Sequence, residues 1–337
     1  MAVKLSSITS WQSGSVRYDS GGKTGAHGIR AVKVLVYGAG GVGSFYGALL
    51  ARGGHQVHFV ARGAQLEAIR QRGLRISSVT LGELSAPSLV ATSSAAEATG
   101  VELVLVCVKT HQTAAILDDL AIAVGPDTLV IALQNGVEAD EVLAVRFGRH
   151  RVPAAVVYVG STVTEPGVVT HVANGLILLG APRGFDPRLL ETLQKALSVT
   201  GLPVRIAGDI REEQWRKLVW NASFNPMSAL VERTPGELLA TPPLRALVSG
   251  LMREVIAVAR AQGIEISESE IDEQIGWTQA NPAIRTSMEV DRQRGRPLET
   301  EALVGVVVRR GRECGVPTPL SDQIYAQLRA INGVSTK

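Results

Sequence analysis

Short apolar runs alternate with longer helical stretches between residue 31 and about residue 150. This alternation predicts a parallel sheet in which each strand is followed by a helix, that is, a doubly wound α/β domain. The predicted strands are Val32–Tyr37, Gln56–Ala61, Val101–Val108 and Thr128–Leu133, and the predicted helices are Ser44–Arg52, Ala64–Arg72 and Thr113–Ala123.

Two further regions have an extended pattern. Residues 74–92 contain short extended pieces, which predict a small antiparallel excursion. A second extended set, residues 154–159, 167–173 and 176–179, is interrupted by the turn signals Glu165-Pro-Gly and Asn174-Gly175. We expect this second set to extend the main sheet.

After Gly208 the strand pattern ends and helical periodicity dominates. We therefore expect two domains, a sheet domain over residues 31–208 and a helical domain over 209–330, with a boundary near residues 205–212. A cleft between two such domains is a common place for a small substrate. The predicted helices are Glu212–Val231, Pro243–Gln262 and Glu301–Cys314.

The composition fits this picture. A chain of 337 residues suits two domains, and an apolar fraction of 45% is enough for a sizeable core. Cys107 and Cys314 cannot build a disulfide framework, so a reducing cytoplasm is the simplest location. No apolar run reaches the roughly 18 residues that a membrane span needs.

The net charge of +3 lies entirely in residues 1–30. That segment has Lys4, Arg17, Lys23 and Arg30 against Asp19, so the rest of the chain is neutral and gives no case for a nucleic-acid surface. A basic, serine-rich start is found in transit peptides. Because it lacks an amphipathic helix, we favour a disordered or non-native extension over residues 1–30.

A glycine-rich turn follows the first predicted strand, with the sequence Gly38-Ala39-Gly40-Gly41-Val42-Gly43. In a dinucleotide-binding turn the first glycine allows the tight bend, the second lets backbone approach a pyrophosphate and the third lets helix pack on strand. Its place between a strand and a helix favours a Rossmann-type cofactor domain over an ordinary glycine-rich turn.

The end of the second predicted strand distinguishes NAD from NADP. It carries no carboxylate, and Arg62 follows it. An arginine there accommodates a ribose 2′-phosphate, so we expect NADPH as the cofactor, although a solvated loop arginine is the alternative. Lys109 and Asn135 end the next two strands and are placed to reach the cofactor or substrate.

A polar stripe follows the start of the helical domain. Lys217, Asn221 and Asn225 recur every four residues and drift by only about 40° per step on a helix. Leu218, Val219, Ala222 and Phe224 have the pattern of a core face. Pro226 is expected to kink or end the helix. The alternative for the stripe is a solvated helix face.

These two motifs together resemble the ketopantoate reductase (2-dehydropantoate 2-reductase) family. The resemblance covers roughly residues 31–330. It includes the turn at residues 38–43 and the stretch from Trp215 through Lys217, Asn221 and Asn225 to Pro226. Further matches are Val108-Lys109, Gln134-Asn135-Gly136, residues 171–175, Thr286-Ser287-Met288 and Glu299.

The resemblance implies a role for each matching residue. Lys217 would protonate the ketone oxygen as hydride arrives at the carbonyl carbon, and Asn221 and Asn225 would bind the substrate. Ser287 would bind the substrate carboxylate. Asn135 would contact cofactor and substrate, and Glu299 would hold the substrate hydroxyl or the cofactor ribose. Residues 38–43, Arg62 and Lys109 would bind NADPH.

The resemblance is incomplete at residues 233–238, where Thr234-Pro235 stands in place of an asparagine that is common in the family. One substrate hydrogen bond is then missing, which puts the substrate in question more than the reaction. Reduction of ketopantoate in pantothenate and coenzyme A synthesis is the leading hypothesis. The alternatives are a reductase of another small 2-oxo acid, a 3-hydroxy acid dehydrogenase and a non-catalytic NADPH sensor. A homodimer is compatible with each.

The sequence offers no metal-binding motif. The histidines that follow the glycine-rich turn are scattered, and none has a ligand spacing such as His-x-x-x-His. His171 follows an extended run and suits a structural or cofactor-proximal position more than that of a catalytic base. The histidines concerned are His55, His58, His111, His150 and His171.

Overall fold

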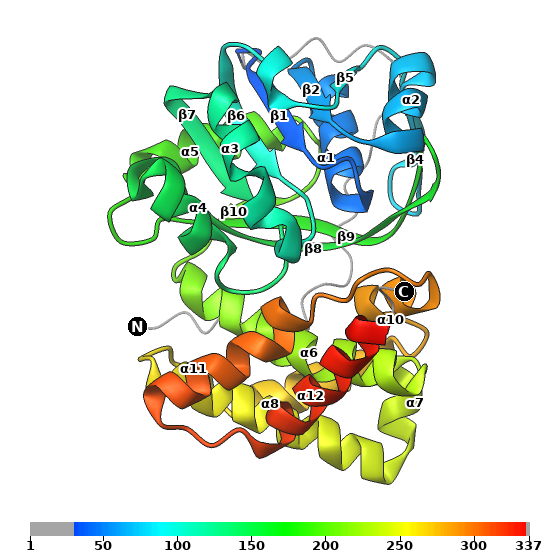
Figure 1. Cartoon of the computed structure of the whole chain (residues 1–337), viewed down its shortest axis with the longest axis vertical. Coiled ribbons are helices and arrows are strands. Elements are labelled where there is room, and N and C mark those ends of the chain that lie inside the picture. The colour runs from blue at the N-terminus through cyan, green and yellow to red at the C-terminus, as the bar shows by residue number, and fades with distance from the viewer. Residues whose placement is uncertain (1–29, 335–337) are drawn as a thin grey trace. The chain divides into compact units, whose positions relative to one another are not determined.

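The computed structural model describes residues 30–334, so the expected N-terminal extension lies, except for Arg30, outside the described residues. The described chain divides into two compact units, one up to Ile210 and the other from Arg211 onward. In Figure 1 the first unit runs from blue to green and the second from yellow-green to red.

The first unit contains the predicted parallel sheet, in the order β5-β2-β1-β6-β7 with every neighbouring pair parallel. This confirms the α/β, Rossmann-type fold class. The strands are β1 (Lys33–Tyr37), β2 (Gln56–Val60), β5 (Val90–Thr92), β6 (Val101–Val106) and β7 (Val124–Ala132). The helices after them are α1 (Gly41–Arg52), α2 (Gly63–Arg72), α3 (Thr113–Ala123) and α4 (Ala139–Phe147).

Both faces of this sheet are buried, as a parallel sheet requires. Val34 and Val36 of β1 belong to one apolar core with Phe45 of α1. Successive strand residues point to opposite faces. Leu35 therefore belongs to a second core, which it shares with Leu120 of α3. The continuous apolar run that revealed β1 in the sequence comes from this double burial.

The second extended set does not extend the main sheet, and that prediction is wrong. Its residues form β8 (Ala154–Glu165) and β9 (Val168–Gly180), an antiparallel pair in a separate sheet. Val157 of β8 and Ile177 of β9 share a core with Phe45, so α1 lies between the two sheets. The other strands of this sheet are β3 (Leu74–Ser78), β4 (Gly82–Ala86) and β10 (Val204–Ile206), the last after α5 (Arg188–Ser198).

The antiparallel excursion is confirmed for β3 and β4, which pair antiparallel. Its last piece, β5, instead joins the main sheet beside β2. The expected break at Asn174-Gly175 is a bulge inside β9, where both residues have positive φ, 62° and 127°. A turn signal inside a strand pattern can mark a bulge rather than an end.

His171 of β9 is fully buried where three elements meet. Its ring stacks on Phe45 of α1, with 4.2 Å between centroids, and its Nδ1 lies 2.8 Å from the Ser78 hydroxyl oxygen of β3. Its Nε2 lies 3.0 Å from the carbonyl oxygen of Asn174 and therefore carries the proton. Burial lowers the pKa of His171, which favours this neutral ring and a structural role.

The second unit is helical, and no strand occurs between residues 211 and 334. No helix in the described range is long and apolar enough to cross a membrane. The helices are α6 (Ile210–Val231), α7 (Pro235–Ala240), α8 (Pro242–Ala261), α9 (Ser269–Ala280), α10 (Ser287–Gln293), α11 (Val306–Cys314) and α12 (Pro319–Val334).

Helix α6 does not end at Pro226, so of the two expected outcomes, a kink or an end, only the kink stays a prediction. Proline removes one backbone hydrogen bond and clashes with the preceding turn, at a cost of about 3 kcal/mol. The helix continues to Val231 because Met227 and Ala229 beyond the proline are buried. Packing of an apolar face therefore outweighs the local penalty.

The predicted helix Glu301–Cys314 begins with an irregular turn. Residues Glu301–Gly305, labelled η5, are π-helical, and α11 continues from Val306. A π turn has wider i→i+5 bonding and is often found at functional sites. The Tyr325 hydroxyl of α12 lies 2.8 and 2.9 Å from the two carboxylate oxygens of Glu301. This contact ties the irregular turn to α12.

Candidate functional site

The glycine-rich turn has the geometry that its sequence predicts. Gly38 has φ of +105°, which favours glycine. A Cβ on Gly43 would lie 2.0 Å from the carbonyl oxygen of Gly38, so only glycine lets α1 approach the strand. Gly40 differs, because a Cβ there would meet nothing within 4 Å. The middle glycine therefore faces open space while its neighbours face protein.

The start of α1 is suited to an anion. Gly40 is the N-cap residue, no side chain within the described chain caps the helix, and its first turn has no acidic residue. The first N–H groups of a helix have no acceptor within it, and they carry the positive end of the helix dipole. Backbone donors next to open space at Gly40 fit the pyrophosphate of a dinucleotide.

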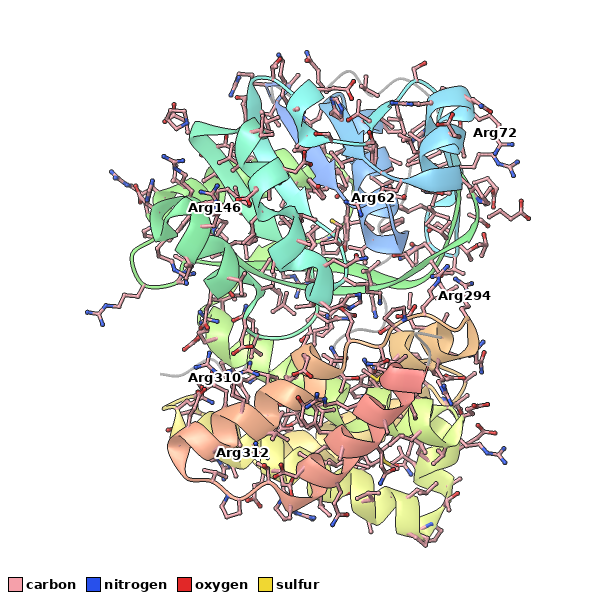
Figure 2. All side chains as sticks on the ribbon, viewed as in Figure 1. Arg62, Arg72, Arg146, Arg294, Arg310 and Arg312 are labelled. Atoms are coloured by element: carbon pink, nitrogen blue, oxygen red, sulfur yellow. The ribbon has the colours of Figure 1, made fainter. Side chains whose placement is uncertain are left out.

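Arg62 lies where the cofactor hypothesis needs a cation. It follows β2 and serves as the N-cap residue of α2. Its positive charge acts on the Tyr37 hydroxyl at the end of β1, and that hydroxyl donates a hydrogen bond to Asp119 at 2.7 Å. Burial and the bond to Asp119 raise the pKa of Tyr37 to about 12. In the view of Figure 2, Arg62 lies within the outline of the sheet unit, whereas Arg72 extends from its edge.

The ends of β6 and β7 are tied together by one amide. Gln134 donates two hydrogen bonds of 2.8 Å, to the Val108 carbonyl and to the Thr113 hydroxyl. The Thr110 hydroxyl also donates to the Asn135 carbonyl, at 3.3 Å. Lys109 and Asn135 therefore lie on adjacent loops at the carboxyl edge of the sheet, the edge that carries the glycine turn and Arg62.

The polar stripe of α6 is buried rather than solvated. Asn221 is 6% exposed and Asn225 is 2% exposed, while Lys217 is partly buried. This contradicts the alternative of a solvated helix face. The predicted core face is confirmed, since its members are buried: Leu218, Val219, Ala222 and Phe224.

Lys217 has an altered proton affinity. Burial lowers its pKa to about 8, and the negative charge of Glu299 acts in the opposite direction. Glu299 is itself buried, at 7% exposure. A lysine with a pKa close to neutral can both hold and release a proton under physiological conditions, which is what a general acid needs.

Two buried oxygens on α6 have no hydrogen-bond partner among the described residues. They are Oδ1 of Asn225 and the hydroxyl of Ser228. Ser228 lies eleven residues after Lys217, which places it within about 20° of Lys217 around the helix. Leaving such atoms unpaired costs about 1–3 kcal/mol each, so they suit a polar ligand. Ser228 was missed in the sequence, although its spacing continues the stripe.

Ser287 is exposed and begins the short helix α10, whose N-cap Thr286 accepts a hydrogen bond from the Glu289 N–H. Its proposed contact with a carboxylate stays a prediction. Thr234 caps α7 in the same manner: its side chain accepts a hydrogen bond from the Glu237 N–H, and the Glu237 side chain accepts one from the Thr234 N–H. The departure from the family pattern at Thr234-Pro235 thus has a structural explanation, since threonine followed by proline is a strong helix start.

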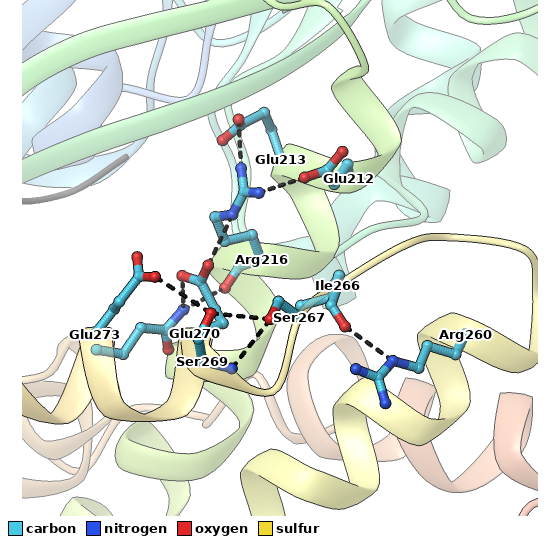
Figure 3. Close-up of polar contacts among 10 residues, drawn as sticks. Glu212, Glu213, Arg216, Arg260, Ile266, Ser267, Ser269, Glu270 and Glu273 are labelled. Atoms are coloured by element: carbon cyan, nitrogen blue, oxygen red, sulfur yellow. Dashed lines mark hydrogen bonds and ion pairs between the residues drawn. The ribbon is translucent and has the colours of Figure 1, made fainter. Parts of the chain in front are cut away.

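A charged cluster that the sequence did not reveal lies directly before Lys217. Arg216 forms ion pairs with Glu212 and Glu213 on α6 and with Glu270 on α9 (Figure 3). The Glu213 pair measures 2.7 Å and the Glu270 pair 3.0 Å. Gln274 of α9 adds a bond to the Arg216 carbonyl at 2.9 Å. These contacts fix the first turns of α6 against α9.

Replacement of Arg216 by methionine is expected to destabilise the protein by about 3–5 kcal/mol, because Glu270 would stay buried without its cation. Burial already raises the pKa of Glu270. The loss of unfolding free energy should therefore be smaller at pH 5, where the Glu270 carboxyl group can take up a proton. Urea unfolding at pH 8 and pH 5 measures both effects.

The control for this prediction is Arg233→Met, which removes the exposed ion pair between Arg233 and Glu237 on the same unit. An exposed pair contributes at most about 1 kcal/mol, so this variant should unfold like the wild type. Equal losses of unfolding free energy in the two variants would mean that the Arg216 ion pairs stabilise the protein no more than an exposed pair does.

The structure therefore assembles two sets of residues. One set, on the sheet unit, is the glycine turn with Arg62, Lys109 and Asn135. The other, on the helical unit, is the α6 stripe with Glu299, whose negative charge acts on Lys217. Among the described residues no group of three or more His, Cys, Asp or Glu side chains could hold a metal ion.

Comparisons with known proteins identify both units. The family model described as "Ketopantoate reductase PanE/ApbA" matches residues 34–184, and its C-terminal counterpart matches residues 209–332. A 2-dehydropantoate 2-reductase from Mesorhizobium japonicum is 34% identical over 321 residues, covering 89% of this chain and 98% of that protein.

Solved structures agree with these matches. A 2-dehydropantoate 2-reductase from Geobacter metallireducens has a TM-score of 0.85 at 34% identity, covering 89% of this chain and 99% of its own. A D-mandelate dehydrogenase in complex with NADH and anilino(oxo)acetate has a TM-score of 0.83 at 22% identity, covering 90% of this chain and 99% of its own. At that identity the likeness concerns the fold alone.

Proposed function

Because this chain belongs to the ketopantoate reductase family, we propose that it reduces 2-dehydropantoate to pantoate with NADPH, the reductive step toward pantothenate and coenzyme A. Membership of this family implies an oxidoreductase with a nicotinamide cofactor. The choice of NADPH, the residue roles and the substrate of this particular chain are parts of the proposal.

The observation that carries the proposal is the buried stripe of α6. A partly buried lysine and two buried asparagines, spaced by four residues, are not what helix stability would select. Lys217 holds a proton for the oxygen of the substrate ketone, and Asn221 and Asn225 supply amide groups that orient the substrate. The unpaired Oδ1 of Asn225 can accept a hydrogen bond from a substrate hydroxyl.

NADPH supplies the hydride when bound. The residues that would hold it are those of the glycine turn, whose backbone N–H groups would bind a phosphate, and Arg62, whose cation would bind the 2′-phosphate. Lys109 and Asn135 would lie nearer the nicotinamide, and Ser287 would bind the substrate carboxylate. Glu299 would act on the substrate side, next to Lys217.

The direct test is a steady-state assay of the purified full chain with NADPH and ketopantoate, followed by loss of absorbance at the nicotinamide band. We expect saturable turnover. A panel of other small 2-oxo acids and 3-hydroxy acids belongs in the same experiment, because the resemblance to the family pattern is incomplete at Thr234-Pro235. Faster turnover of another acid would replace the proposed substrate, and binding of NADPH without turnover of any acid would favour a sensor.

Arg62→Ala should weaken NADPH far more than NADH, because a charge-assisted bond to phosphate contributes about 1.5–3 kcal/mol, or roughly 10–100-fold in affinity. The KM for each cofactor measures this. Arg72→Ala is the matched control, since Arg72 ends the same helix about 15 Å away and contacts the Pro166 carbonyl. Equal losses for both cofactors in Arg62→Ala would place the 2′-phosphate elsewhere.

We place this activity in the cytoplasm, because Cys107 and Cys314 are free thiols, which suits a reducing compartment. Light scattering of the purified protein would decide between a monomer and the homodimer that the sequence leaves open.

A further inference from the structure

The side chain of Asn332, near the end of α12, is bonded to the segment that carries Glu299. Its Oδ1 accepts a hydrogen bond from the Leu298 N–H at 3.0 Å. Its Nδ2 donates to the Leu298 carbonyl at 3.2 Å and to the Thr300 hydroxyl at 3.0 Å. One amide group thus makes three bonds to the residues on either side of Glu299.

The segment that Asn332 holds is buried. Leu298 is 4% exposed, Glu299 is 7% exposed and Thr300 is 2% exposed. Residues 296–299 belong to no helix or strand, so no regular ladder fixes the backbone before Glu299. An irregular buried segment needs side-chain partners for its backbone groups, and Asn332 supplies them at Leu298.

Helix α12 also fixes the other side of this segment. The Tyr325 hydroxyl bonds the Glu301 carboxylate at the start of the π turn, and the Leu303 N–H bonds the Glu299 carbonyl at 3.3 Å. Tyr325 and Asn332 are two turns of α12 apart, so they lie on the same face. The backbone around Glu299 is therefore held from both directions by one helix.

The orientation of Glu299 matters because it acts on Lys217 electrostatically. The other carboxylates near that part of α6 are engaged elsewhere: Glu212, Glu213 and Glu270 bind Arg216. On the side of α12, Glu301 binds Tyr325, whose ring also lies under Arg329. Among these carboxylates, Glu299 is therefore the one whose negative charge acts on Lys217.

We propose that Asn332 is a positioning residue for the reductase reaction, which it serves by holding the backbone on both sides of Glu299 so that the Glu299 carboxylate keeps its place near Lys217. The reaction that Asn332 would serve rests on the proposed function, whereas the hydrogen bonds between Asn332 and the segment around Glu299 do not. Without Asn332, Glu299 can turn toward water. Lys217 then loses a neighbouring negative charge and gives up its proton at lower pH.

The test compares Asn332→Leu and Thr300→Val with the wild type as full-length proteins. Leucine keeps the branched shape of asparagine but makes none of the three bonds, and valine removes only the bond at Thr300. In Asn332→Leu the alkaline limb of kcat/KM should move down by about one pH unit, the size of a lost neighbouring charge. Activity at pH 8 then falls about fivefold, while activity at pH 6 is retained. Thr300→Val should give a smaller shift in the same direction.

A second readout does not depend on turnover. Trinitrobenzenesulfonate reacts only with uncharged amines, so the pH midpoint of labelling at Lys217, read by peptide mass spectrometry, reports its proton affinity directly. This midpoint should fall in Asn332→Leu by the same amount. If the protein does not reduce ketopantoate, the proposed function fails, yet the labelling midpoint still decides the role of Asn332.

Two comparisons separate positioning from mere stabilisation. Glu299→Gln should reproduce the shift, and adding Asn332→Leu to it should cause no further shift. The matched control is Asn281→Leu, which removes another side-chain amide bond of the helical unit, to the Trp277 carbonyl at 2.9 Å, and should leave the midpoint unchanged. A wild-type midpoint in Asn332→Leu, or an equal loss of activity at every pH, would overturn the proposal.

Discussion

Lys217→Ala should lower kcat for ketopantoate by about 10²–10⁴-fold, the usual contribution of a positioned general acid. Hydride addition to a ketone leaves negative charge on oxygen, and the Lys217 ammonium both neutralises that charge and donates the proton. Binding of NADPH should survive, because the residues proposed to hold it lie on the sheet unit. A fluorescence titration with NADPH and steady-state rates measure the two effects separately.

The same residue predicts the pH dependence of the wild type. The acid must be protonated to act, and burial lowers the pKa of Lys217 to about 8. The rate should therefore be constant near neutral pH and decline as pH rises through about 8. Lys195→Ala, an exposed lysine on α5, is the control and should be unaffected. Normal turnover in Lys217→Ala would remove the proposed mechanism.

Gly43→Ala is expected to abolish NADPH binding and to destabilise the sheet unit by about 1–3 kcal/mol or more, as forced overpacking does. Its added Cβ would lie 2.0 Å from the Gly38 carbonyl oxygen and 2.9 Å from the Cys107 Cβ. Neither neighbour can move freely, because Gly38 is part of the tight turn and Cys107 directly follows strand β6, which pairs with β1 and β7. Thermal unfolding and NADPH titration report the two losses.

Gly40→Ala provides a matched comparison in the same turn. Nothing lies within 4 Å of the added Cβ, so this variant should unfold like the wild type. Its affinity for NADPH should nevertheless be lower than that of the wild type, because the methyl group would occupy the space through which the pyrophosphate approaches. Wild-type affinity for NADPH in Gly40→Ala would mean that the cofactor does not bind at the glycine turn.

The sheet unit was largely predictable because its signals are local. A parallel strand buried on both faces is a continuous apolar run, and the glycine turn marks the passage from β1 to α1. The membership of β8 and β9 in a second sheet was not predictable. Their pattern identifies a strand but contains no information about its neighbour, which here is set by packing on α1.

The site was predictable where its residues share one helix. The spacing of Lys217, Asn221 and Asn225 is visible in the sequence because helical geometry turns it into a stripe. The contacts of Asn332 with Leu298, and of Arg216 with Glu270, join residues 34 and 54 positions apart. No periodicity in the sequence predicts such pairs, since asparagine and arginine are also common on solvated surfaces.

The π turn at Glu301–Gly305 has a consequence for engineering. Deleting one residue from it, such as Ala302, would let the turn close as an ordinary α-helix, a form with better backbone geometry. Residues before the deletion would then rotate by about 100° around the axis and carry the Glu299 carboxylate away. A screen for thermal stability alone would select that deletion, so a thermostable variant of this enzyme should be screened for catalytic activity as well.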